Sequence, residues 1–135
     1  MPSIIDKRIL IFSKNADNTV ENAVVTVCEE LHIGEEKFGN ILLAVTEAVD
    51  NAITHGNHNN PKKSVELTYQ HSDKDVTFAI KDEGEHSFNL EKVTDPTKPE
   101  NPSEAGRGIL LMKMLSDKLE FLNEQKTVLL SFNLN

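Results

Sequence analysis

Two polar side chains stand four positions apart in a segment that otherwise has the composition of a buried helix. They are Glu47 and Asn51, flanked by the apolar residues Val45, Ala48 and Val49. Side chains four apart on an α-helix lie on the same face, about 6 Å from one another. A carboxylate can accept a proton and an amide oxygen can ligate Mg²⁺, so the pair could serve magnesium-nucleotide chemistry. A solvated helix edge is the alternative.

A second polar segment, Asp82, Glu83 and Gly84, directly follows an alternating apolar pattern typical of a strand. Asp82 could accept a hydrogen bond from the exocyclic amine of adenine. Gly84 could let a flat ring approach the backbone, because it has no Cβ. Asp and Gly are also common in plain turns at strand ends. The segment is therefore a candidate for base recognition, with an ordinary turn as the alternative.

The third segment, Gly106, Arg107 and Gly108, precedes an apolar stretch that predicts a helix from about Ile109. Backbone N–H groups at the start of a helix bind phosphate, and an arginine adds charge-assisted hydrogen bonds. A flexible hinge would explain the two glycines as well. The segment lacks the Walker pattern, and it does not follow a strand as a dinucleotide fingerprint does.

Hydrophobic periodicity indicates the elements that would position these groups. Apolar residues spaced by three and four predict helices at about 17–32 and 35–55, and Gly56 suits the left-handed position that ends a helix. Alternating or short apolar runs predict about five strands, at about 7–13, 65–69, 76–80, 118–123 and 126–133. Because most strands form hairpins, we expect an α+β two-layer sandwich with helices on one sheet face, not a doubly wound parallel fold.

The stretch of about 85–106 has no periodicity and contains Pro96, Pro99 and Pro102. Irregular segments of this length in a compact domain are commonly lids or linkers. We expect a lid that joins the base-binding and phosphate-binding segments, within a single domain spanning residues 1–135.

Composition limits the class of protein. The chain has 135 residues, and its formal net charge of −8 disfavours nucleic acid as a direct partner, because duplex binding depends on Lys and Arg neutralising phosphates. No apolar run reaches the roughly 18 to 20 residues that cross a bilayer. The N-terminus has no signal-peptide pattern, and the single Cys28 has no disulfide partner. We expect a cytoplasmic protein without a membrane segment.

The three segments together resemble the GHKL ATPase superfamily, and within it the bacterial anti-sigma factor serine/threonine kinases. In that family a motif has the form E-A-x-x-N-A-x-x-H-[AG], which Glu47 to Gly56 match at every fixed position. The resemblance covers nearly the whole chain. It implies the Bergerat fold, with a mixed, mostly antiparallel sheet of about five strands backed by helices, and ATP and Mg²⁺ as cofactors.

Residue by residue, the resemblance implies that Glu47 is the general base and Asn51 the magnesium ligand. Asp82 would recognise adenine, and Gly84 would lie beneath the ring. We expect His55 to have a packing role, because no cluster of His, Cys and Asp with transition-metal spacing surrounds it.

In the same comparison, Gly106 and Gly108 would close the lid on the phosphates, and Arg107 would add positive charge. Thr127 resembles a threonine that supports the adenine pocket, although Thr in a strand is commonly only a β-former. The family's adenine motif is often D-x-G-x-G, and His86 stands in place of its second glycine. That departure bears on the geometry of the lid.

The resemblance implies a protein kinase that transfers the γ-phosphoryl group of ATP to a serine or threonine of a small anti-sigma factor antagonist. It also implies control of a sigma factor by partner switching, and a homodimer. Two alternatives are a non-catalytic nucleotide-binding module that docks partners and a simple ATPase of the same fold. A third, the ATP-binding half of a sensor histidine kinase, is weakened because no helical phosphoacceptor segment precedes Lys7.

Overall fold

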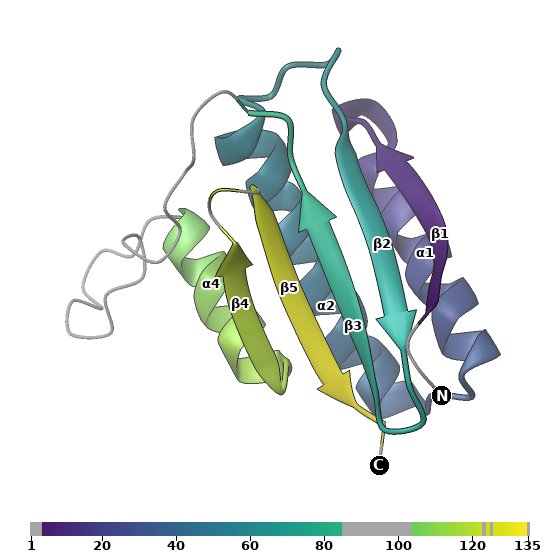
Figure 1. Cartoon of the computed structure of the whole chain (residues 1–135). Helices are drawn as coiled ribbons and strands as arrows, with labels where there is room; N and C mark the ends of the chain where they lie inside the picture. The colour runs from purple at the N-terminus through teal and green to yellow at the C-terminus, as the bar shows by residue number, and fades with distance from the viewer. Residues whose placement is uncertain (1–3, 85–103, 123, 125, 135) are drawn as a thin grey trace.

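The strands of the chain form one sheet, and its helices lie against one face of that sheet (Figure 1). The computed structural model describes residues 4–84, 104–122, 124 and 126–134. The strands are β1 (Ile4–Ile11), β2 (Val65–His71), β3 (Asp75–Lys81), β4 (Lys118–Leu122) and β5 (Thr127–Asn133). The helices are the 3₁₀ turn η1 (Ser13–Asn15), α1 (Ala16–Glu30), α2 (Glu35–Asn51), the π-helix η2 (Ala52–Gly56) and α4 (Glu104–Leu115). The expected two-layer α+β class is confirmed.

The strand order is β1-β2-β3-β5-β4, and each of the four pairings between described strands is antiparallel. The mixed character that the resemblance implied is therefore not found among these strands. Every second residue is buried along β2, β3 and β5. The register aligns these residues, with Ile80 opposite both Leu67 and Val128. One face of the sheet is thus apolar, and the helices cover it.

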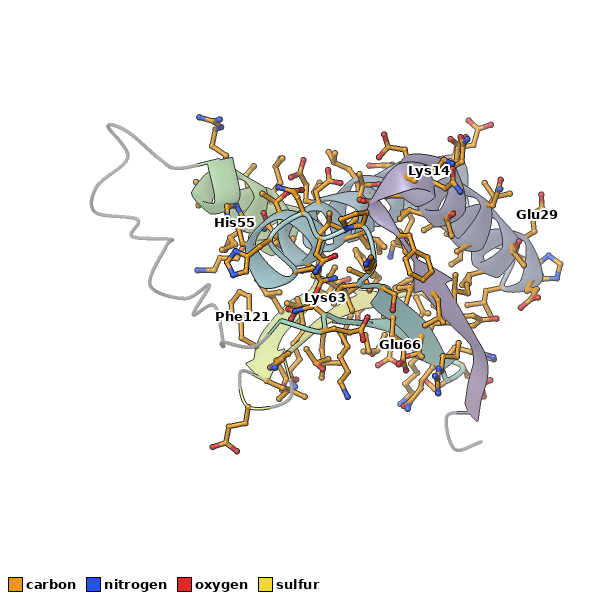
Figure 2. The ribbon with its side chains drawn as sticks, turned by 90° about the horizontal axis from the view of Figure 1, so that it is seen from above. Lys14, Glu29, His55, Lys63, Glu66 and Phe121 are labelled. Atoms are coloured by element: carbon orange, nitrogen blue, oxygen red, sulfur yellow. The ribbon has the colours of Figure 1, made fainter. Side chains whose placement is uncertain are left out.

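The core lies between the helix layer and the sheet, as Figure 2 shows along the strands. Burying a large apolar side chain contributes about 1.5–3 kcal/mol, so the apolar stripes of the helices fix their orientation. The fully buried residues include Val20, Val24 and Val27 of α1, Ile41, Val45 and Val49 of α2, and Phe78, Leu130 and Phe132 of the sheet. None of the described helices is long and apolar enough to cross a membrane.

The second helix ends differently from the prediction. Its α-helical part stops at Asn51, and the chain continues as η2, in which the Asn57 N–H donates to the Ala52 carbonyl at 2.8 Å. The predicted left-handed conformation of Gly56 is wrong, since no described glycine has a positive φ. His58 and Asn59 take φ values of 53° and 59° and redirect the chain.

The last helix begins earlier than predicted, at Glu104, so Gly106 to Gly108 lie inside α4 and not ahead of it. The expected lid of about 85–106 lies outside the described residues as far as residue 103, and the prediction for His86 lies outside them too. The last three residues of that expected segment belong to the first turn of α4.

Candidate active site

Glu47 and Asn51 meet Gly108 where α2 packs against α4. A Cβ added to Gly108 would lie 2.8 Å from Glu47 Oε2 and 3.3 Å from Asn51 Nδ2. A side chain at this position would require Glu47 and Asn51 to shift, so the missing Cβ lets α4 approach the pair closely. The structure therefore brings together two of the three segments that the sequence analysis singled out.

A cavity of about 310 Å³ opens beside this contact. Its volume lies at the lower end of the range of ligand pockets, roughly 300–1,000 Å³. Carboxylates, an amide and a guanidinium line it, so it suits a small charged group. The lining residues are Glu47, Asp50, Asn51, Thr54, His55, Arg107, Gly108 and Leu111. His55, expected to pack, thus also borders this cavity.

Asn51 has a buried polar atom whose hydrogen-bonding capacity is unused among the described residues. Its side chain is only 6% exposed, and its Nδ2 atom has no hydrogen-bond partner among the described residues. Buried side-chain amides are nearly always paired, because an unpaired buried donor costs about 1–3 kcal/mol. A phosphate oxygen could accept from this amide, while an amide oxygen is a ligand that Mg²⁺ accepts together with phosphate oxygens. The residues present therefore fit a magnesium-bound phosphate.

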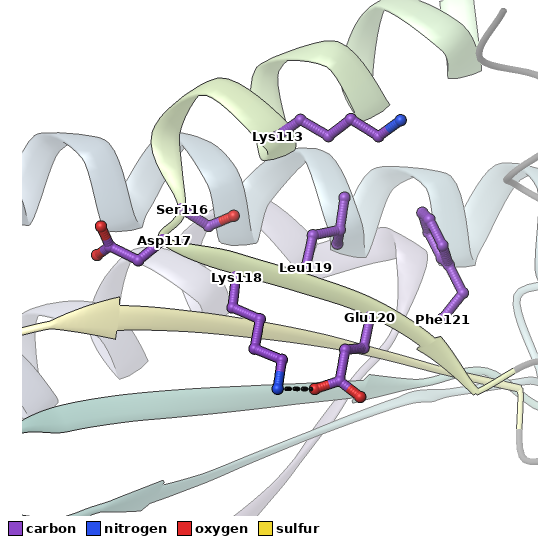
Figure 3. A pocket seen from close by; sticks show the side chains of 7 residues that line it. All are labelled: Lys113, Ser116, Asp117, Lys118, Leu119, Glu120 and Phe121. Atoms are coloured by element: carbon purple, nitrogen blue, oxygen red, sulfur yellow. Dashed lines mark ion pairs between the residues drawn. The ribbon is translucent and has the colours of Figure 1, made fainter.

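A larger cavity, of about 680 Å³, lies between α4 and β4 (Figure 3). None of the predicted site residues borders it. Two of its charged side chains pair with one another, Lys118 Nζ with Glu120 Oε1 at 2.9 Å. Its lining residues are Lys113, Ser116, Asp117, Lys118, Leu119, Glu120 and Phe121. Size alone does not identify the site, because the groups capable of chemistry converge on the smaller cavity.

Asp82 and Gly84 pack against the end of η2. A Cβ added to Gly56 would lie 2.4 Å from Asp82 Cγ, and one added to Gly84 would lie 2.1 Å from the Gly56 carbonyl oxygen. Both glycines are thus required by a close approach of the two segments. The expected place of Gly84 beneath a flat ring stays a prediction, and the close approach of the Gly56 backbone is a second reason for glycine at this position. The sequence analysis had given Gly56 no part in this contact.

The Asp82 carboxylate is partly buried and held by hydrogen bonds. Gly84 N–H donates to Asp82 Oδ1 at 2.8 Å, and Asp82 N–H donates to the Lys126 carbonyl at 3.1 Å. Burial raises the pKa of Asp82, while the Gly84 N–H bond and the electrostatic effects of Lys126, Lys63 and His58 act in the opposite direction.

Asn57 connects three segments around this cluster and was missed by the sequence analysis. It is 2% exposed; its Oδ1 accepts from Glu83 N–H at 2.8 Å and its Nδ2 donates to the Ser64 carbonyl at 3.0 Å. The Glu83 carboxylate accepts in turn from the Ser64 N–H and hydroxyl, and these bonds lower the pKa of Glu83. The residues after β3 are therefore fixed relative to η2.

Comparison with known proteins now decides the family. Residues 14–132 match the histidine kinase-like ATPase domain. The chain belongs to this family. The resemblance to GHKL ATPases is confirmed, and the strand order and helix layer described above are the fold of this family member.

Curated relatives carry more specific names. The anti-sigma F factor of Bacillus cytotoxicus is 34% identical over 93 residues, which cover 67% of this chain and 63% of the relative. The serine-protein kinase RsbW of Oceanobacillus iheyensis is 30% identical over 105 residues, which cover 73% and 66%. The anti-sigma F factor of Clostridium acetobutylicum is 30% identical over 104 residues, which cover 76% and 72%. The chain thus spans just under two thirds of the length of the first two relatives.

Three further residues were predicted for the site: Gly106, Arg107 and Thr127. Gly106 lies in the first turn of α4, and Arg107 borders the smaller cavity. Thr127 pairs with Lys81 across the sheet, so strand alternation places its side chain on the face of Lys81, away from the helices. Its expected support of the adenine pocket stays a prediction. The residue opposite Asp82 is Lys126.

Proposed function

We propose that this protein is an ATP-dependent serine/threonine kinase that phosphorylates a small anti-sigma factor antagonist and controls a sigma factor by partner switching. The observation that carries the proposal is the contact of Gly108 with both Glu47 and Asn51. Beside this contact, the Glu47 carboxylate, the buried Asn51 amide and the Arg107 guanidinium line one cavity. The names of the relatives, anti-sigma F factor and serine-protein kinase, support the same reading.

Glu47 acts as the general base in this proposal. Its carboxylate accepts the proton of the attacking serine or threonine hydroxyl while that oxygen bonds to the γ-phosphorus. The bond between the γ-phosphorus and the β–γ bridging oxygen breaks, and ADP leaves. A positioned base contributes about 100- to 10,000-fold to such a step.

Asn51 and the start of α4 hold the phosphates. Asn51 would hold Mg²⁺ through its amide oxygen, and the ion would neutralise negative charge on the phosphates. The N–H groups in the first turn of α4, which includes Gly106, favour an anion, and Arg107 adds a cation beside them. At the other end of the site, Asp82, with Gly84 next to it, accepts a hydrogen bond from the exocyclic amine of adenine.

Transfer of label from ATP tests the proposal. The protein is incubated with Mg²⁺, γ-labelled ATP and the candidate antagonist encoded beside it, and the phosphorylated residue is mapped. We expect label on one serine or threonine of the antagonist and none after its replacement by alanine. Label found only as free phosphate would make the protein a simple ATPase. Nucleotide binding without turnover would leave a non-catalytic docking module. Copurification with a sigma factor tests partner switching.

A further inference from the structure

One lysine holds both ends of the segment that carries Asp82. The Lys126 carbonyl accepts from Asp82 N–H at 3.1 Å, and the Lys126 ammonium donates to the Gly84 carbonyl oxygen. Gly84 N–H completes the loop by donating to Asp82 Oδ1 at 2.8 Å. The three residues therefore form a closed set of hydrogen bonds around the carboxylate.

The backbone of Lys126 suggests that its side chain is what the position requires. Its φ is 54°, in the left-handed region, which glycine and asparagine adopt more readily than lysine. A residue held in a sparsely populated conformation motivates a search for a functional reason. Here the ammonium reaches Gly84, which asparagine or glycine could not do.

The charge of Lys126 also acts on Asp82. Its ammonium favours the ionised carboxylate against the effect of burial, and Lys63 and His58 act in the same direction. Of these three residues, Lys126 also bonds to the backbone of the segment, through the Gly84 carbonyl. An ionised, fixed carboxylate is a strong acceptor for an amine, because hydrogen bonds to charged groups are stronger than those between neutral groups.

We propose that Lys126 is a positioning residue that sets base specificity, by holding Asp82 in place to accept the exocyclic amine of adenine. The inference rests on the proposed nucleotide site and adds to it the group that aims the acceptor. Without the ammonium, Gly84 and Asp82 lose one tether and the carboxylate can turn away from the amine. The preference for a base that carries the amine then falls, while contacts to the phosphates remain.

The test compares two ligands that differ only in that amine, ATP and purine riboside 5′-triphosphate, by calorimetric titration with Mg²⁺. We expect the wild type to prefer ATP roughly tenfold or more. Lys126→Met and Lys126→Asn should reduce the preference to about threefold or less, and Lys126→Arg should keep it. Asparagine tolerates the observed φ, so the second variant protects against a folding defect. Lys63→Met is the matched control, since it removes a nearby charge without the Gly84 bond, and should keep the preference.

A purely structural lysine would weaken both ligands equally, and that result would overturn the inference. Undiminished preference for ATP in Lys126→Asn would also overturn it. If Lys63→Met and Lys126→Met lost the preference for ATP equally, a general effect of charge would explain the preference and the inference would be overturned. These outcomes differ from a failure of the nucleotide site itself, in which the wild type would bind neither triphosphate.

Discussion

Two buried asparagines, six positions apart, mark the two ends of the candidate site. Asn51, at the proposed phosphate end, is 6% exposed, and its Nδ2 lies beside a cavity without a hydrogen-bond partner among the described residues. Asn57, at the base end, is 2% exposed and uses both polar atoms to join Glu83 to Ser64. The same kind of side chain thus has an unpaired donor beside a cavity in one place and joins two backbone segments in the other.

The glycines of the two ends differ in the same way. A Cβ on Gly108 would meet the far ends of the Glu47 and Asn51 side chains, whereas one on Gly84 would meet the Gly56 backbone. Side-chain ends can move, but packed backbone moves only at a cost. The phosphate end is therefore adjustable and incomplete, and the base end is fixed before any ligand arrives.

The largest effect is expected from Glu47→Gln, which tests whether the adjustable end does chemistry. The amide keeps the shape of the carboxylate and cannot accept the proton, so phosphoryl transfer should fall by about 100- to 10,000-fold, or about 3–5 kcal/mol in activation free energy. ATP affinity should stay within a few-fold. Single-turnover transfer and calorimetry measure the two quantities, and full transfer activity would leave the mechanism without its base.

Asn51→Ala tests whether the unpaired amide serves a ligand. We expect magnesium-dependent ATP affinity to fall roughly 10- to 100-fold, because contacts to charged groups contribute about 1.5–3 kcal/mol. The stability of the ligand-free protein should change little, because the Nδ2 donor that is removed has no partner among the described residues. Titrations with and without Mg²⁺ give the affinity, and an unchanged value would remove the metal assignment.

Gly84→Ala tests the fixed end. The new Cβ would lie 2.1 Å from the Gly56 carbonyl oxygen, so backbone must shift, at a cost of about 1–3 kcal/mol in unfolding free energy. Gly39→Ala is the matched control: it is exposed in α2, and nothing lies within 4 Å of the added methyl group. Alanine there should stabilise by about 0.5–1 kcal/mol. Chemical denaturation of both variants should give opposite signs.

Asn57→Ala sharpens the contrast with Asn51. It leaves the Glu83 N–H and the Ser64 carbonyl without their partner, so we expect a loss of about 1–3 kcal/mol in the free energy of unfolding. Asn51→Ala, measured in the same denaturation experiment, should lose clearly less. Equal losses would mean that the two asparagines have the same structural role.

Local pattern sufficed for the presence of the helices, though not for their ends, and for the hairpins and the shared face of Glu47 and Asn51. Each of these depends on residues close in sequence, whose periodicity records which face is buried. The contact of Gly108 with the pair was expected only by resemblance, because it arises from the packing of two helices far apart in the chain. The sequence shows that both segments have suitable residues, and the packing shows that they meet.

The features missed at the base end arise where distant backbone segments touch. Gly56 was assigned a helix-ending conformation, but its lack of a Cβ serves the approach of Asp82. The π-helix η2 has no distinct hydrophobic pattern, since it changes the helix only locally. Lys126 was expected only as the first residue of the last strand, and its contact with Gly84 becomes visible once the two segments are placed side by side. Such contacts leave no periodic signal in either segment.

The smallest effect is expected from Asp82→Asn. The substitution tests whether a partly buried, ionised carboxylate at the fixed end lowers the stability of the fold. Burial raises the pKa of Asp82 in the folded state. The protonated carboxyl group therefore makes its full contribution to the free energy of unfolding below the unfolded pKa of about 3.9. That contribution is lost as the pH rises through the folded pKa. Asparagine cannot ionise and can still accept from Gly84 N–H. The variant should therefore melt slightly higher than the wild type at pH 7, with a difference that vanishes toward pH 3. A difference that instead grows on acidification would mean that the ionised carboxylate stabilises the fold.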